Sequence, residues 1–100
     1  MYGLEENTIC KIKKVFSKFP QIEKVILYGS RAKGNFHNGS DIDITLTGNE
    51  LTLGNSVYPI MDALEEMYLP YTFDISILRH IKDKDILDHI NRIGVVFYSS

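Results

Sequence analysis

The stretch KVILYGS, residues 24–30, decides the fold of this chain. Its first part is an apolar, partly β-branched run of strand length, and Gly29 ends it. A glycine at the exit of a buried strand allows a turn that other residues resist and lets a ligand approach the backbone. Ser30 is expected to open a short helix, so phosphate oxygens are predicted in front of Gly29-Ser30. The alternative is an ordinary turn with a capping serine, and no Walker A ending follows.

A second stretch, DIDITLT at residues 41–47, alternates polar with apolar side chains. This period of two predicts a strand with one covered face, and its other face carries the acids. Asp41 and Asp43 then point the same way, with Cα atoms about 7 Å apart. Oxygen ligands at this spacing suit hard cations such as Mg²⁺. The alternative is a solvent-facing strand edge whose acids deter aggregation.

A third acid strengthens the metal interpretation. Residues 71–78, YTFDISIL, are predicted to form another strand, and Asp74 lies inside this otherwise apolar run. A carboxylate that is buried or half-buried there needs a partner charge or a metal ion. We therefore expect Asp74 to share a metal with Asp41 and Asp43.

Three helical stripes surround these strands. Apolar residues repeat at helical spacing over 9–19, 57–67 and 86–93. Pro20 and Gly94 mark two helix ends, while Pro59 requires either a late start near Ser56 or a kink. Residues 95–98 are expected to add a fourth strand. The pattern predicts an α/β (α+β) fold with a small mixed sheet of three or four strands and helices mainly on one face.

Composition limits the function further. A chain of 100 residues with 44% hydrophobic and 24% charged content predicts a single domain over residues 1–100. The net charge of -2 and the pI near 5.8 disfavour extended nucleic-acid binding. Cys10 is the only cysteine, which excludes an internal disulfide and favours a cytoplasmic location. No apolar stretch approaches the roughly 20 residues of a membrane helix, so no membrane association is expected.

The compound motif resembles a known family. GSRAKG at residues 29–34 and, after five further residues, SDIDI at residues 40–44 resemble the signature of the polymerase-beta-like nucleotidyltransferases. FDIS at residues 73–76 is similar to the strand that carries the family's third carboxylate. YLPY at residues 68–71 and RIG at residues 92–94 resemble the minimal (MNT) branch, so the resemblance covers nearly the whole chain.

This resemblance implies a reaction and its residues. Gly29 and Ser30 would hold the triphosphate of ATP, and Asp41 and Asp43 would bind two Mg²⁺ ions, with Mn²⁺ as an alternative. Asp74 would bind the catalytic ion and help to deprotonate an acceptor hydroxyl. A nucleoside monophosphate, AMP in the first instance, would pass to the acceptor with release of pyrophosphate.

Three further residues are secondary candidates near the nucleotide. Arg31 and Lys33 would add positive charge beside the phosphates, although long basic side chains at a helix start are commonly solvated. Ser40 is expected to support the turn before the acid pair by bonding to backbone.

The resemblance also implies a partner, because a chain this small cannot build a full acceptor pocket. Members of the minimal branch resemble antitoxins that pair with a helical HEPN protein, and some are thought to transfer AMP to its tyrosine. A homodimer or a hetero-oligomer is therefore expected. One alternative is a catalytically silent module that neutralises or scaffolds a helical partner by contact. Another is transfer to a small molecule, as in antibiotic-modifying relatives, which carry extra helical domains.

The remaining polar residues are interpreted without a role in the chemistry. Neither the histidines nor the charge clusters show a ligand spacing, so we read them as solvated. These residues are His37, His80, His89, Glu65-Glu66 and the segment 82–85. Tyrosines at positions 2, 58, 68 and 98 are expected to anchor a core or an interface.

Overall fold

One mixed sheet organises the structure, with its strands in the order β3-β2-β1-β4. The computed structural model describes residues 1–100. β1 (Lys24–Tyr28) pairs antiparallel with both β2 (Ile42–Thr47) and β4 (Val95–Ser99), whereas β2 pairs parallel with β3 (Phe73–Ile77). The prediction of a small mixed sheet is confirmed, and residues 95–99 supply the fourth strand.

The sheet has an apolar face and a polar face. Alternate residues of β1 and β2, such as Val25, Leu27 and Ile44, are buried on the apolar face. Asp43 and Thr45 alternate with them and therefore lie on the polar face. The acids are thus held out of the core by strand periodicity.

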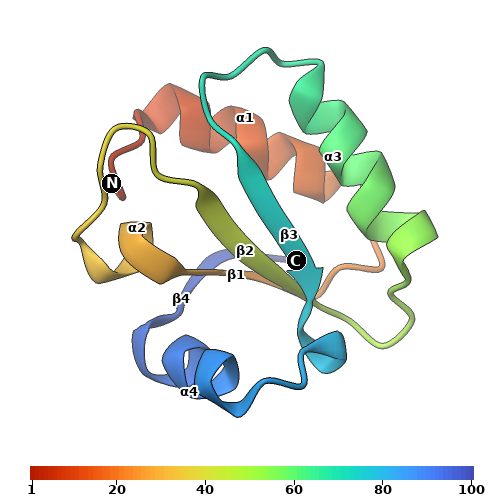
Figure 1. Cartoon of the computed structure of the whole chain (residues 1–100). Coiled ribbons are helices and arrows are strands. Elements are labelled where there is room, and N and C mark those ends of the chain that lie inside the picture. Colours follow the sequence, from red (N-terminus) through yellow and green to blue (C-terminus); the bar gives the residue numbers. More distant parts are fainter.

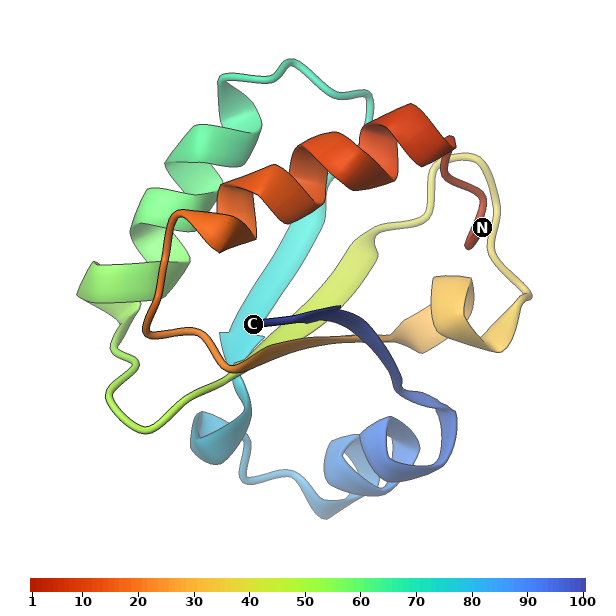
Figure 2. The same cartoon turned by 180° about the vertical axis from the view of Figure 1, so that it is seen from behind.

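Two helices cover the apolar face. α1 (Glu6–Ser17) and α3 (Tyr58–Glu65) lie next to each other there (Figures 1 and 2). Phe16 of α1 packs against the rings of Phe97 and Tyr98 of β4. α4 (Lys84–Ile93) covers the other face beside β1, so helices are present on both sides. The longest helix, α1, has 12 residues, and none combines the length and apolarity required to cross a bilayer.

The start of α3 resolves the uncertainty about Pro59. A π-helical turn, Leu53–Val57, precedes the helix and is capped by Thr52 and Asn55, each of which bonds to the backbone of the other. α3 then begins at Tyr58, with Pro59 in its first turn. A proline is tolerated there because the first N–H groups of a helix have no partner within it.

Candidate functional site

Gly29 lies where β1 passes into the short helix α2 (Gly29–Lys33). Its φ of +75° is in the left-handed region that favours glycine. A Cβ at this position would overlap Oδ2 of Asp43 and come within 3.0 Å of its Cγ. The turn therefore requires glycine for two reasons, and it brings the backbone directly against a carboxylate of β2.

The three aspartates lie on neighbouring strands. Asp43 and Asp74 are partners in the parallel register of β2 and β3, which puts their Cα atoms about 4.8 Å apart. Asp41 precedes β2, and its carboxylate accepts a hydrogen bond from the Thr72 hydroxyl. The expectation that Asp74 is buried or half-buried is wrong, because it is exposed on an edge strand. Asp74 is not turned into the interior.

Burial and the neighbouring negative charges both disfavour the charged form of Asp43. Asp43 is half-buried, and burial raises its pKa above the ordinary value. The charges of Asp74 and Asp41 raise the pKa further, while His89 acts in the opposite direction. The only ion pair in the structure, Arg92 with Asp88, lies on the outside of α4. The acids therefore form an uncompensated negative site that favours a cation.

Tyr28 extends the site across the sheet from its position opposite Asp43. Its phenol is half-buried, and burial raises its pKa. Contact with the Ser76 hydroxyl lowers this pKa, and the charges of Asp74 and Asp43 raise it again. The phenol is consequently protonated at neutral pH and can donate a hydrogen bond beside the acids.

A pocket of about 320 Å³ connects these groups. It lies between the polar face of the sheet and α4, and its lining includes Gly29, Asp43 and Asp74. Asp85 and His89 of α4 also line it. The sequence interpretation treated both of these residues as solvated and missed their contribution.

His89 corrects that interpretation most clearly. Its Nε2 accepts a hydrogen bond of 3.0 Å from the Gly29 N–H, and its ring lies edge-on to Tyr28. The Gly29 N–H is therefore engaged, and phosphate binding at this turn depends on the remaining groups. One signal was visible in the sequence, since His89 lies three residues after Ile86 and four before Ile93, on the apolar stripe of α4.

Arg31 lies elsewhere than expected. Its side chain is 2% exposed, and Nε and Nη2 donate to the Ser40 carbonyl at 3.2 and 3.0 Å. Nη1 donates to the Tyr2 carbonyl at 3.0 Å, and the guanidinium lies over the rings of Phe36 and Tyr71. Since all three nitrogens are engaged, the guanidinium does not face the phosphates. It instead supports the backbone that leads into the acid pair.

The other predicted nucleotide contacts differ in their surroundings. The Ser40 hydroxyl accepts a hydrogen bond of 2.7 Å from the His37 N–H, which agrees with the predicted support of the turn. Ser30 is half-buried in the first turn of α2, near the Gly29 turn. Lys33 is exposed at the end of α2. Ser30 and Lys33 therefore remain candidates for contact with phosphates.

The donor set fits a hard divalent cation. Its members are carboxylates with no paired Lys or Arg, and oxygen ligands are those that Mg²⁺ prefers. The three carboxylates do not form a complete ligand cluster, and no group of three His, Cys, Asp or Glu side chains does so elsewhere. The Asp41 carboxylate instead accepts a hydrogen bond from the Thr72 hydroxyl.

The family profile described as Polymerase beta, Nucleotidyltransferase matches residues 10–100. The chain belongs to this family. A search of curated protein sequences finds no match for the nucleotidyltransferase.

Solved structures share the fold. One of them is a toxin–antitoxin crystal structure with AMP-PNP, whose matched chain is 21% identical with a TM-score of 0.72. The match covers 92% of this chain and 73% of that chain. A complex of tri-AMPylated Shewanella oneidensis HEPN toxin with MNT antitoxin is 19% identical, with a TM-score of 0.62, and covers 100% and 74%. A putative nucleotidyltransferase from Sulfolobus solfataricus is 23% identical, with a TM-score of 0.56, and covers 92% and 77%. At these identities the likeness is one of fold.

The position of Arg31 leads to a prediction that separates support from phosphate binding. Arg31→Ala is expected to lower the free energy of unfolding by on the order of 3 kcal/mol, because several charge-assisted hydrogen bonds are lost inside the protein. For a domain of this size the loss corresponds to a melting temperature lower by about 10 °C or more. Thermal unfolding followed by circular dichroism measures the change.

The matched control is Lys33→Ala, which removes an exposed positive charge from the same helix. It should leave the melting temperature within about 1 °C, as surface substitutions usually do. Well below its melting temperature, Arg31→Ala should bind ATP within about threefold of the unsubstituted chain, a difference of under 1 kcal/mol. Loss of ATP binding without loss of stability would contradict this assignment.

Proposed function

We propose that this nucleotidyltransferase transfers AMP from ATP to a hydroxyl of a helical HEPN-type protein and so acts as its antitoxin. One observation carries the proposal: Asp43 lies directly against the Gly29 turn and in register with Asp74, and no basic side chain is paired to either acid. Two of the similar structures add support, since one contains AMP-PNP and the other an AMPylated HEPN toxin with its MNT antitoxin.

The site residues divide the work of an in-line displacement. The Gly29 turn and Ser30 orient the triphosphate, with Lys33 nearby to balance its charge. Asp41, Asp43 and Asp74 would hold two Mg²⁺ ions, or Mn²⁺, which when bound neutralise charge on the phosphates and on the acceptor oxygen. Asp41 has to give up its hydrogen bond from Thr72 in order to bind an ion together with Asp43 and Asp74.

Asp74 lies on the edge strand β3, and we assign it to the acceptor side of the site. Its carboxylate accepts the proton of the acceptor hydroxyl and passes it to water. The acceptor oxygen forms a bond to the α-phosphorus of ATP, and the bond from that phosphorus to the β-phosphate oxygen breaks. AMP remains on the acceptor, and pyrophosphate leaves.

The proposal treats residues 1–100 as one minimal domain that works in a hetero-oligomer, or as a homodimer that binds the partner. The partner completes the acceptor side, which the chain alone does not enclose. The cytoplasm is the expected location, because ATP and Mg²⁺ are present there. The exposed free thiol of Cys10 agrees with a reducing compartment.

The direct test is to incubate the chain with ATP, Mg²⁺ and a HEPN protein and to weigh the HEPN protein by mass spectrometry. We expect an increase of one or more AMP units, which EDTA abolishes. Asp41→Ala should abolish it as well, whereas Glu50→Ala, at an exposed acid outside the site, should retain it. An unchanged mass of the HEPN protein would reject the proposal.

A catalytically silent module is distinguished in cells. If contact alone neutralises the toxin, the double variant Asp41→Ala/Asp43→Ala should still protect cells that express the HEPN protein. We expect this variant to lose protection while it still co-purifies with the HEPN protein. Retained protection would favour the silent module.

A further inference from the structure

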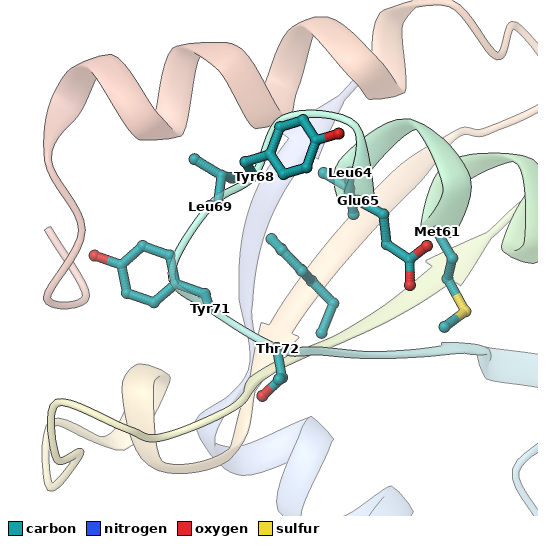
Figure 3. A pocket seen from close by; sticks show the side chains of 8 residues that line it. Met61, Leu64, Glu65, Tyr68, Leu69, Tyr71 and Thr72 are labelled. Carbon is teal, nitrogen blue, oxygen red and sulfur yellow. The ribbon is translucent and has the colours of Figure 1, made fainter.

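A pocket larger than the one at the Gly29 turn lies elsewhere in the structure. It measures about 420 Å³ and opens between α3, the connection that follows it and the start of β3. Figure 3 shows Met61 and Glu65 of α3 on one side of it and Leu69 and Tyr71 of the connection on the other. Six of its eight lining residues are hydrophobic, and Glu65 is the only charged one. The pocket therefore suits an apolar side chain.

Tyr68 forms an exposed rim to this pocket, which we call the α3–β3 pocket. It is 92% exposed, although it is an aromatic residue next to an apolar cavity. Its φ of +51° is in the left-handed region, which a bulky side chain rarely adopts. Backbone strain of this kind costs about 1–3 kcal/mol and is concentrated at functional positions. An aromatic side chain held outward beside a pocket is typical of a protein-binding anchor.

The part of the chain that forms the α3–β3 pocket contains acidic residues and no Lys or Arg. All 11 Lys and Arg residues lie within residues 1–33 and 79–100, so residues 34–78 contain none. Seven of the 13 acids lie in this middle segment, which forms β2, α3, β3 and the pocket. Glu65 lines the pocket, and Asp62 and Glu66 are exposed on the same helical segment. The acids of this helical segment, at and beside the α3–β3 pocket, therefore favour a basic segment.

The pocket adjoins the proposed acceptor side of the site. Thr72 lines the pocket and donates a hydrogen bond to Asp41, and Asp74 follows it on β3. The strand order puts the Gly29 turn on the β1 side of these acids, whereas the pocket lies at the β3 edge, on the face that α3 covers. Thr72, at this edge, connects the pocket with the polar face that carries the acids. In an in-line displacement the attacking and leaving oxygens lie on opposite sides of the phosphorus. When a triphosphate lies at the Gly29 turn, the β3 side of the site therefore stays open to the acceptor.

We propose that the α3–β3 pocket holds an apolar side chain from a basic segment of the acceptor protein, next to the hydroxyl that receives AMP. The proposal rests on the proposed function for its choice of acceptor side. The hydrophobic anchor sets the position of the segment, and the acids around the pocket attract its Lys and Arg residues. Occupancy of the pocket then holds the hydroxyl beside Asp74.

The test uses isotope-labelled full-length chain, nuclear magnetic resonance and three synthetic peptides. The first contains a Leu-Tyr core flanked by arginines, the second has the same core flanked by glutamates, and the third has the arginines with a Gly-Ser core. We expect the first peptide to shift the amide signals of Tyr68, Leu69 and Thr72. It should bind at least about tenfold more tightly than either of the others, a difference of about 1.4 kcal/mol.

Matched variants locate the binding. Tyr68→Ala and Glu65→Lys are both at exposed positions, so neither should unfold the chain. Each should weaken binding of the first peptide by at least about fivefold, or about 1 kcal/mol. Tyr58→Ala is the control, because Tyr58 is 57% exposed on the same helix and does not line the pocket. Equal effects of Tyr58→Ala and Tyr68→Ala would overturn the proposal.

A titration with ATP and Mg²⁺ in the same samples separates the two proposals. If the signals of Gly29 and Asp43 respond to nucleotide but the first peptide leaves the pocket signals unmoved, the pocket proposal is overturned and the transferase stands. Equal binding of the first and third peptides would also overturn it, because attraction by charge alone needs no pocket. If the nucleotide moves no signal, the proposed function fails, and the peptide titration alone decides the pocket.

Discussion

Asp43→Asn is expected to reduce AMP transfer by on the order of a thousandfold, because it removes a charged ligand of the ions and a charge next to the phosphates. The same substitution is expected to raise the melting temperature of metal-free protein. Asp43 has a raised pKa, from burial first and from the charges of Asp74 and Asp41 second, so its charged form destabilises the folded state. Transfer is measured by mass spectrometry, and stability by thermal unfolding in EDTA.

The pH dependence of this gain has a defined sign. The folded protein binds the Asp43 proton more tightly than the unfolded chain does. In the unsubstituted chain, protonation of Asp43 therefore stabilises the fold, and this contribution is fully present below the ordinary pKa of 3.8. It is lost as the pH rises through the higher pKa of the folded state. The melting-temperature difference between Asp43→Asn and the unsubstituted chain should therefore widen as the pH rises above 3.8.

Mg²⁺ should reverse this ranking. Binding to the folded state stabilises the unsubstituted chain, whereas Asp43→Asn should gain much less. The control is Glu50→Gln, at an exposed acid outside the site, which should keep both transfer and the response to Mg²⁺. A metal-free Asp43→Asn protein that melts below the unsubstituted chain would contradict this account of the acids.

Gly29→Ala is the second substitution with a large expected effect, on structure as well as on transfer. An alanine Cβ would overlap the Asp43 carboxylate and would also have to adopt a φ of +75°. We expect transfer to be lost and the free energy of unfolding to fall by on the order of 3 kcal/mol, from backbone strain together with overpacking. Thermal unfolding and the transfer assay measure the two effects.

Gly34→Ala provides the matched control. Gly34 has a φ of +97°, but a Cβ there would meet no heavy atom within 4 Å. It shares the backbone strain of Gly29→Ala without the overlap, so it should lose about 1 kcal/mol and retain transfer. Equal effects at both glycines would show that the close approach of Gly29 to Asp43 contributes neither to stability nor to transfer.

Local patterns predicted the elements well because they depend on neighbours in the chain. The apolar run of residues 24–28 became β1, and the alternation after Asp41 became β2 with its acids on the polar face. The helical stripes became α1, α3 and α4, with Gly94 at the end of the last. Side-chain periodicity is sufficient for such assignments, since strands and helices repeat at different intervals.

The exposure and the contact partners of individual side chains were harder to predict, because they depend on residues distant in the sequence. Asp74 lies in an apolar run, yet it is exposed because β3 is an edge strand and its polar face is open. Arg31 belongs to the compound motif, yet its guanidinium is buried against Ser40 and Tyr2. His89 reaches the Gly29 N–H across 60 residues of chain. The sequence pattern puts His89 on the apolar stripe of α4, but no local pattern gives the partners of His89 and Arg31 or the exposure of Asp74.

The sequence by itself determined which residues form strands, where the glycine turn falls and which aspartates share a face, because each depends on backbone preference over a few residues. Tertiary structure alone decided the order β3-β2-β1-β4 and with it the pairing of Asp43 with Asp74. It also decided the burial of Arg31 and the position of the α3–β3 pocket beside Thr72. The physical reason is that strand order and pockets result from packing between distant segments, and no local periodicity encodes which segments meet.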